Sequence, residues 1–404
     1  MRRLSWAMLL VFSFTIPWEY SLDLGAPLGN IARIAGLVLL LAVIPAALQA
    51  GRIRAPGLMQ WLILAFFLWI CCSYFWSIDT VSTLERMRAY AQVMMTVWLV
   101  WELTESPEDL RDLMRAYVAG SWVLAALTIV NFISPATAGQ VRFAAEGQDP
   151  NDVARFLDLG FPMAALLLHA DQRRWGKALA LGYLPIGLAG VVLTASRGGL
   201  LVASLAIVGC GLLLIRTHRR AVVGGFLALP ALAVIFWLTV PHATVARIAT
   251  IPEQLMGGDL NQRFNIWAAG WQAFVRAPLF GSGAGSFVAA AGLARIDTAH
   301  DTALSVAVDG GLVALALALA IVVAAARNVF VTRGPARIAL ATALMVWMAT
   351  SLSAMVEGNR STWFLLALIA VASRLAVEAP VAMSLQFETG ARLGKNLGFA
   401  GPTA

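Results

Sequence analysis

Long apolar stretches separated by short polar turns run along almost the whole chain. Each stretch is about 20 residues long, which allows a helix to cross a hydrocarbon core about 30 Å thick. Inside lipid only a helix or a closed barrel satisfies its own backbone, and the alternation of barrel strands is missing. The pattern therefore predicts an all-α integral membrane protein with about twelve transmembrane helices, at roughly 4–20, 29–50, 57–77, 86–104, 113–134, 152–170, 177–194, 199–215, 221–240, 301–326, 337–356 and 361–377.

Residues 241–300 form the longest interruption of this pattern. They contain Arg247, Arg263, Arg276 and Arg295 and end on His300, where the next apolar stretch begins. Between 261 and 277, apolar residues recur every three to four positions, which predicts an amphipathic helix at the membrane surface, followed by a shorter helix at 285–294. We therefore expect a membrane domain over 1–377, which includes this large loop, and a cytoplasmic tail over 378–404.

Composition supports the membrane assignment and sets the orientation. Hydrophobic residues make up 60% of the chain and charged residues 13%, whereas a soluble protein carries about 25% charged residues. Most of the 29 lysine and arginine residues lie in turns on one side of the predicted membrane, in segments such as DQRRWGK, RTHRR and RNVFVTRGPAR. By the positive-inside rule both termini are cytoplasmic and loop 241–300 faces outward. This accounts for the net charge of +7 without nucleic acid, which we do not expect as a partner.

The sequence offers no recognisable cofactor site. Cys71, Cys72 and Cys210 lie inside apolar stretches, and no cysteine and histidine spacing is typical of a metal site. No glycine-rich phosphate loop follows a predicted strand. We therefore expect no metal, no cofactor and no nucleotide, and a process driven by a pre-activated substrate or by a gradient.

Two residues at the outer face are the first candidates for chemistry. His300 lies at the mouth of an apolar span, where a neutral imidazole can accept a proton near pH 7. Arg197 lies in a tight turn of small residues, and Ser196 or Thr194 can cap the following helix, so that its N-terminus adds to an anion site. The alternatives are a hydrogen-bonded interfacial histidine and an arginine that reaches lipid headgroups.

Further polar residues lie near the same face. Arg263 opens the amphipathic helix, where its charge opposes the helix dipole and thus favours an anionic partner. Asn151 precedes the sixth span, and helix capping by Asn151 or Asp152 explains that segment without any function. Arg155 lies one turn into the membrane, where a charge is expensive.

The last outer turn contains Glu357 and Arg360, which can simply pair with each other.

Four groups of residues occur together in a characteristic order. They are Pro150-Asn151-Asp152 before an apolar span, Thr194-Ala195-Ser196-Arg197-Gly198-Gly199 in a turn, Arg263-x-x-x-Trp267 with Pro278-Leu279-Phe280-Gly281-Ser282-Gly283, and His300-Asp301 followed after nine residues by Gly311. In these groups the chain resembles the bacterial O-antigen ligase and polymerase superfamily, most of all the ligases. It departs from the ligase pattern at Asp301, where Asn, Ser or Gln is usual, and at Ala314, where Gly, Thr or Tyr is usual.

The resemblance implies a metal-independent glycosyltransferase of the bacterial inner membrane, with its active site facing the periplasm. It implies transfer of a glycan from undecaprenyl pyrophosphate to a sugar hydroxyl of lipid A–core, with inversion at the anomeric carbon. His300 is the expected catalytic base. The expected donor-binding residues are Arg197, Arg263, Arg155 and Asn151, with support from Ser196, Asp301, Glu357 and Arg360. We expect a monomer among membrane lipids.

Three alternatives remain open at this point. A polymerase would use a second lipid-linked repeat as acceptor, and a relative that glycosylates proteins would use a protein hydroxyl. The single large loop and the spacing of His300 and Gly311 favour a ligase. A transporter of lipid-linked glycan is the alternative without catalysis, but the sequence shows none of the internal repeats on which many transporters are built.

Overall fold

The computed structural model describes residues 2–25, 29–51, 53–137, 139–215, 217–257, 263–294 and 297–396. Within these ranges the regular elements are helices, apart from one isolated bridge between Asp23 and Asn30, which confirms the all-α prediction. Seven helices of the described part are long and apolar enough to cross a membrane. The total of twelve crossings and the compartment at each end stay predictions.

Every predicted span coincides with a helix of the structure. These helices are α1 (Arg2–Thr15), α2 (Ile31–Ala50), α3 (Leu58–Cys72), α4 (Thr80–Leu103), α5 (Pro107–Ile133), α6 (Pro150–Ala170), α7 (Arg174–Leu193), α8 (Arg197–Leu214), α9 (Arg219–Thr239), α14 (Thr302–Val331), α15 (Gly334–Ser351) and α16 (Arg360–Asn396). Short 3₁₀ helices η1 (Ile16–Ser21), η2 (Ser73–Trp76) and η3 (Pro135–Thr137) follow α1, α3 and α5.

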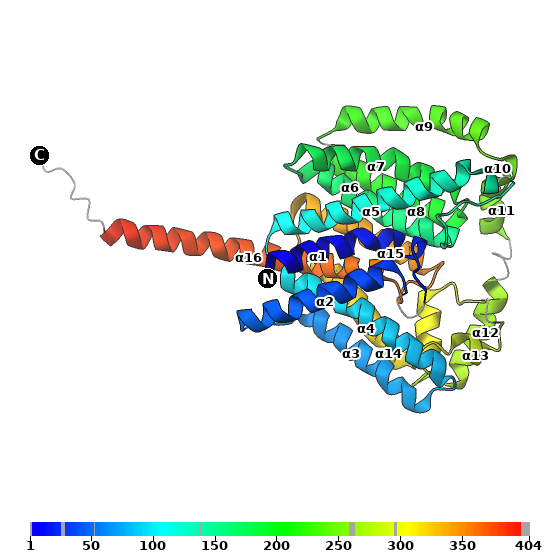
Figure 1. Cartoon of the computed structure of the whole chain (residues 1–404), viewed down its shortest axis with the longest axis horizontal. Coiled ribbons are helices and arrows are strands. Elements are labelled where there is room, and N and C mark those ends of the chain that lie inside the picture. Colours follow the sequence, from blue (N-terminus) through cyan, green and yellow to red (C-terminus); the bar gives the residue numbers. More distant parts are fainter. Residues whose placement is uncertain are drawn as a thin grey trace, which may run out of the picture.

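The described residues of the loop predicted over 241–300 form four short helices at one end of the bundle. They are α10 (His242–Ala249), α11 (Ile251–Met256), α12 (Arg263–Arg276) and α13 (Phe287–Ala291). We call this the α12 end; at the opposite end, the α16 end, α1 begins and α16 leaves the bundle (Figure 1). The helices predicted at 261–277 and 285–294 are thus present as α12 and α13. The structure continues α16 as a helix to Asn396, past residue 377.

Two helices form the centre of the bundle. α6 packs against α5, α7, α8 and α15, and α16 packs against α4 and α14, so most of α6 and most of the part of α16 up to Glu378 are buried. Pro162 lies inside α6, where a proline removes a backbone hydrogen bond. In the turn before it, Tyr183 donates to the carbonyl of Leu157 at 2.5 Å and Tyr117 donates to that of Phe156 at 3.2 Å. These bonds hold α7 and α5 against the centre.

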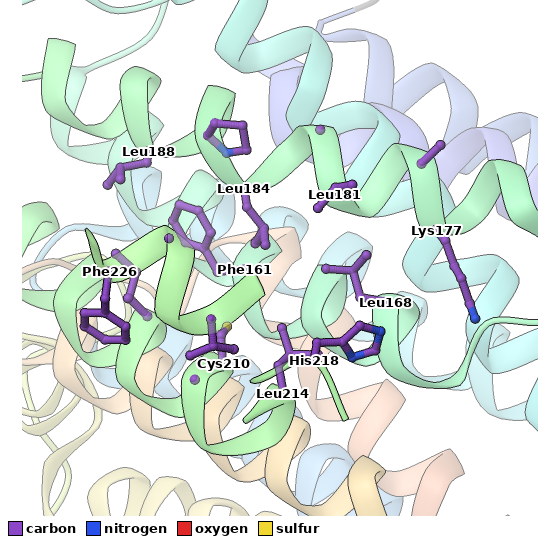
Figure 2. A pocket seen from close by; sticks show the side chains of 17 residues that line it. Phe161, Leu168, Lys177, Leu181, Leu184, Leu188, Cys210, Leu214, His218 and Phe226 are labelled. Atoms are coloured by element: carbon purple, nitrogen blue, oxygen red, sulfur yellow. The ribbon is translucent and has the colours of Figure 1, made fainter. Parts of the chain in front are cut away.

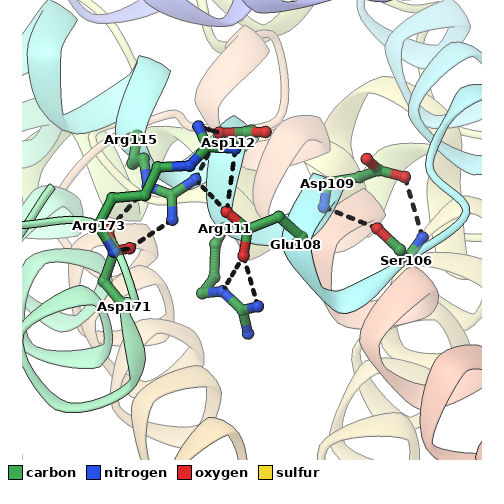
Figure 3. Close-up of polar contacts among 8 residues, drawn as sticks. All are labelled: Ser106, Glu108, Asp109, Arg111, Asp112, Arg115, Asp171 and Arg173. Atoms are coloured by element: carbon green, nitrogen blue, oxygen red, sulfur yellow. Dashed lines mark hydrogen bonds and ion pairs between the residues drawn. The ribbon is translucent and has the colours of Figure 1, made fainter.

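An ion-pair network closes the α16 end of the α5–α7 group (Figure 3). The buried guanidinium of Arg115 donates to both carboxylate oxygens of Asp171, at 2.7 and 2.5 Å, and also contacts Glu108 and Asp112. Arg173 contacts the same two acids, at 3.3 and 2.9 Å. Because Asp171 and Arg173 belong to the turn between α6 and α7, the network fixes that turn against the start of α5.

A break in α14 joins the two parts of the chain that carry the large loop. Gly311 has φ 68° and ψ −166°, a conformation that is essentially restricted to glycine, and interrupts the helix. The loop at 278–285 lies against this break. Ser282 N–H donates to Val308 O at 2.8 Å, Gly283 N–H to Asp309 O at 2.9 Å, and Leu312 N–H to Pro278 O at 2.8 Å. The backbone groups released by the break are thereby paired.

Indole groups and small residues complete this junction. Trp69 donates to Gly310 O at 2.8 Å, and Trp76 donates to Phe280 O at 3.1 Å, so α3 and η2 cover the loop. A Cβ atom on Gly311 would come within 2.2 Å of the Leu279 carbonyl oxygen. Glycine is therefore required at 311 for its conformation and for space.

We predict that Gly311→Ala destabilises the protein far more than Gly292→Ala. Both residues have positive φ, 68° and 66°, but a Cβ on Gly292 meets no atom within 4 Å. The control change should cost about 1–2 kcal/mol from conformation alone. The Gly311 change adds a backbone clash and should cost about 3–5 kcal/mol. Thermal unfolding of both purified variants in one detergent measures the difference, and equal losses would contradict the role of the break.

Candidate functional site: an arginine cluster beside His300

Four segments that are distant in sequence bring basic side chains together at the α12 end. Arg142 lies in the loop before α6, Arg197 is the first residue of α8, Arg247 lies in α10, and Arg263 is the first residue of α12. All four side chains are half-buried. We call these four residues the arginine cluster.

The cluster is close enough for its members to act on one another's ionisation. Burial lowers the pKa of Arg142, and the charges of Arg247, Arg197 and Arg263 lower it further, while Asp149 opposes them. Burial and then the charge of Arg197 also lower the pKa of Arg247 and of Arg263. Arginine stays protonated in spite of such shifts. The lowered pKa values therefore indicate that the four cations repel one another.

Hydrogen bonds fix Arg142 in this position. Its Nε donates to the carbonyl of Thr194 at 3.2 Å, and its Nη2 donates to Oδ1 of Asn151 at 2.8 Å. The hydroxyl of Ser196 donates to the same Asn151 oxygen at 2.9 Å. Asn151 therefore joins the start of α6 to the turn between α7 and α8. Its neighbour Asp149, and not Asn151 or Asp152 as predicted, is the side chain that caps α6.

The turn from Thr194 to Gly199 is built to present Arg197. Ala195 has a positive φ of 47°, and its carbonyl accepts from Nε of Arg247 at 3.2 Å. Of the two capping residues predicted, Ser196 is the one that caps α8, by accepting from Gly199 N–H at 3.2 Å. Arg197 Nη1 donates to Thr250 Oγ1 at 3.1 Å. Because a Cβ on Gly199 would lie 2.5 Å from that of Ala154, glycine also allows this turn to approach α6 closely.

His300 is held next to the cluster by the residues on either side of it. Trp267 donates its indole N–H to the carbonyl of Ala299 at 2.9 Å, and Asp301 caps α14 by accepting from Leu304 N–H at 2.7 Å. His300 itself has a positive φ of 47°. Arg263 and Trp267 are four residues apart and share one face of α12, so the helix that anchors residue 299 also directs Arg263 toward His300.

The surroundings of His300 favour its neutral form. Burial lowers the pKa of this imidazole, the charge of Arg263 lowers it further, and Asp149 and Asp297 oppose the shift. A lowered pKa favours the neutral imidazole at neutral pH, in which one ring nitrogen carries no proton and can accept one; Nε2 lies 3.4 Å from the hydroxyl of Thr298. The arrangement thus combines a proton acceptor with an anion-binding group of cations.

The structure places the remaining predicted residues elsewhere. Arg155 forms an ion pair with Asp152 at 3.0 Å and lies over the ring of Phe156, one turn below Asn151. Its role in donor binding stays a prediction.

Glu357 and Arg360 do not pair with each other, which was one of the possibilities for the last outer turn. Arg360 forms an ion pair with the buried Glu19 of η1, and Glu357 accepts from the hydroxyl of Ser305 at 3.0 Å. Both residues connect helices behind the site: Arg360 binds α16 to η1, and Glu357 binds the loop before α16 to α14.

Two members of the cluster, Arg142 and Arg247, are not among the site residues predicted from the sequence. One property could have singled them out. Both are arginines on the predicted outer side, where the positive-inside rule does not account for basic residues. Arg295, which shares that property, lies outside the described residues. In the described part of the chain no group of three or more His, Cys, Asp or Glu is placed to hold a metal ion.

The fold and this site define a multi-pass helical membrane protein with a cationic, histidine-containing site at one end of its bundle. Residues 182–319 match the family model described as O-antigen ligase, which confirms the resemblance to that superfamily. The matched region includes Arg197, Arg247, Arg263 and His300, and it ends in α14 beyond the break at Gly311.

Two further comparisons add little. A search of curated proteins found no match. Among solved structures, a chain from a study titled "Structural coordination of polymerization and crosslinking by a peptidoglycan synthase complex" is similar, with 17% identity and a TM-score of 0.45. The likeness covers 79% of this chain and 97% of that chain. At this TM-score it decides neither fold nor activity.

We predict that Arg263→Gln raises the pKa of His300, because the change removes the neighbouring charge that lowers it. The NMR titration of the His300 ring in protein with isotope-labelled histidine measures this value. Arg276→Gln is the matched control, since Arg276 is exposed at the other end of α12, about 20 Å along the helix. An unchanged titration of His300 in Arg263→Gln would show that the two groups do not interact.

Proposed function

We propose that this protein is an O-antigen ligase that acts at the α12 end of its bundle, which faces the periplasm. The donor is a glycan on undecaprenyl pyrophosphate, and the acceptor is a sugar hydroxyl of lipid A–core. The observation that carries the proposal is a cluster of four arginines of which one, Arg263, lies near His300, largely within the residues that match the ligase family. The family points to a membrane glycosyltransferase-like enzyme, and the cluster supplies the chemistry that such a donor requires.

The arginine cluster fits the leaving group. A lipid pyrophosphate presents several anionic oxygens at the membrane surface, and guanidinium groups bind such oxygens in pairs while keeping their charge when partly desolvated. Negative charge grows on the pyrophosphate as its bond to the sugar breaks. Cations that are already held in place by Asn151, Thr194, Ala195 and Thr250 stabilise this charge without reorganising.

His300 fits the acceptor side of the reaction. Its imidazole takes the proton of the acceptor hydroxyl while the hydroxyl oxygen forms a bond to the anomeric carbon. The bond from that carbon to the pyrophosphate oxygen breaks, and undecaprenyl pyrophosphate leaves with the electron pair. A single displacement of this kind inverts the configuration at the anomeric carbon and uses no metal ion or nucleotide.

The choice of acceptor rests on the resemblance. The spacing of His300 and Gly311 is that of the ligase pattern, and the structure gives it a physical basis, since Gly311 forms the break on which the large loop is seated. A polymerase or a protein O-glycosylating enzyme would use the same donor site with a different acceptor. Offering lipid A–core, a lipid-linked repeat and an acceptor protein to the purified enzyme distinguishes the three.

We predict that His300→Ala lowers transfer about 10²–10⁴-fold, the usual effect of removing a general base. Purified protein, lipid-linked glycan and lipid A–core are incubated in EDTA without nucleotide, and the product is measured by gel and mass spectrometry. Activity of the wild type should rise with pH as His300 loses its proton and then level off, because the neutral form is the active one.

The control for this experiment is His242→Ala, since His242 is exposed at the start of the same loop. This variant should keep wild-type activity. Near-normal transfer by His300→Ala would remove this residue from catalysis, and loss of wild-type activity in EDTA that a divalent ion restores would contradict the metal-independent reaction.

We predict that Arg197→Ala and Arg263→Ala each lower the single-turnover rate about 10²–10³-fold, as expected for loss of one preorganised charge donor. Lysine should restore little of this activity, because an ammonium group cannot form the two parallel hydrogen bonds of a guanidinium. Arg142→Ala and Arg247→Ala should also weaken binding of undecaprenyl pyrophosphate. Isothermal titration with this lipid measures the affinity separately from the rate.

Arg276→Ala and Arg276→Lys are the controls for these variants, since Arg276 belongs to the same loop but is exposed outside the cluster. If the arginines only reach lipid headgroups, lysine replaces each of them freely and Arg276 behaves like the others. Full activity of both lysine variants, Arg197→Lys and Arg263→Lys, would end the proposal of a pyrophosphate clamp.

A further inference from the structure

A large apolar cavity lies between α6, α7, α8 and α9, away from the arginine cluster (Figure 2). Its volume is about 950 Å³, and aliphatic and aromatic side chains form most of its wall. Along α8 the wall begins at Ile207, ten residues after Arg197, which places it about 15 Å from the start of that helix. The cavity and the candidate active site are therefore separate features.

The cavity has the depth of one lipid leaflet. Its wall on α7 runs from Lys177 to Leu188, which corresponds to about 16 Å of helix. Half of a hydrocarbon core is about 15 Å. Because α7 begins at the α16 end, the cavity occupies the half of the membrane that is opposite to the arginine cluster.

Only the end of the cavity at the membrane surface carries positive charge. Lys177 and His218 lie together at this end, whereas Leu188 lies at the other (Figure 2). Arg174, Arg219 and Arg220 begin the two neighbouring helices, and with Lys177 they are exposed. Within the described ranges, no carboxylate forms an ion pair with any of these four cations. The mouth of the cavity therefore offers charge to an anionic group from outside the chain.

Helix α9 leaves this cavity open to the bilayer. Figure 1 shows α9 at the edge of the bundle beside α7, and within the chain it packs on α8. Leu227, Trp237 and Leu238 on its outer side are well exposed. In a membrane, hydrocarbon fills such a gap, since water would have no polar partners along the wall.

We propose that the cavity is a binding site for an anionic phospholipid of the leaflet at the α16 end. Its acyl chains occupy the apolar wall, and its phosphate lies at Lys177 and His218. The isoprenoid chain of the proposed donor has its anionic head at Arg197, on the other side of the membrane, so it does not use this basic mouth. The site requires only the membrane fold and is independent of the proposed transfer.

Two pairs of variants test the site with matched controls. Gly225 lines the cavity and Gly224 does not, although both belong to α9 and a Cβ on either meets no atom within 4 Å. Gly225→Trp therefore fills the cavity, while Gly224→Trp makes the same change beside it. Lys177→Glu reverses the charge at the mouth, and Arg333→Glu makes a comparable reversal at an exposed residue of the same end of the bundle.

Native mass spectrometry of the full chain counts bound phosphatidylglycerol and phosphatidylcholine after purification in a delipidating detergent. We expect one tightly bound phosphatidylglycerol, preferred over phosphatidylcholine. Lys177→Glu should weaken this lipid at least five-fold and reduce the preference, because loss of one cation at a membrane surface costs about 1 kcal/mol and the new carboxylate adds repulsion. Gly225→Trp should abolish binding of both lipids, and both controls should bind like the wild type.

Three results would overturn the proposal. They are equal binding of the two phospholipids by the wild type, a bound phosphatidylglycerol that survives in Gly225→Trp, and its displacement by equimolar undecaprenyl phosphate. The last result would assign the cavity to the isoprenoid lipid. Size-exclusion profiles and unfolding temperatures of the Gly224 and Gly225 variants show whether a loss of binding is a loss of fold. Two correctly folded variants at the mouth, Lys177→Glu and Lys177→Gln, test the effect of charge.

Discussion

Pairing of the backbone at the break in α14 holds the outer part of this protein in place. A helix that opens in a membrane bundle releases backbone groups that must find partners, and here the loop at 278–285 supplies them. That loop directly follows the end of α12, and His300 and the capping residue Asp301 directly precede α14. One set of hydrogen bonds therefore ties the end of α12, whose first residue is Arg263, to the helix that begins just after His300. Gly311 makes this possible, because any Cβ there would displace the loop.

The stable bundle compensates for an unfavourable arrangement at the α12 end. Four half-buried arginines repel one another, and their lowered pKa values record this repulsion. In the described chain the non-glycine residues with positive φ are Ala195 and His300, and both lie at this site. Local strain and gathered like charge are features that proteins keep where function needs them. An anion bound among the arginines would relieve the repulsion. This relief would add to the binding free energy of the proposed donor.

The sequence predicts local features of this protein better than long-range pairs. Apolar length and periodicity predict the helices, including α12, and the local capping pattern correctly narrows the start of α8 to Ser196 or Thr194, of which Ser196 is the cap. Single motifs also point to Arg197, Arg263 and His300. The pairing of Arg360 with Glu19 joins residues 341 positions apart, so proximity in sequence suggested the wrong partner, Glu357. Arg142 and Arg247 belong to no motif and become recognisable only when the loops fold together.

Burial separates the two basic regions of the molecule into different kinds of site. At the α12 end the arginines are half-buried, and hydrogen bonds to carbonyls and side-chain oxygens fix Arg142, Arg197 and Arg247, which suits binding of an anion with defined geometry. At the α16 end the cations around Lys177 are exposed, and each contributes only about 1 kcal/mol toward an anionic membrane surface. The first arrangement suits a reacting pyrophosphate, whose charge changes during a reaction. The second suits a lipid headgroup, which needs only to be held while its chains fill the cavity.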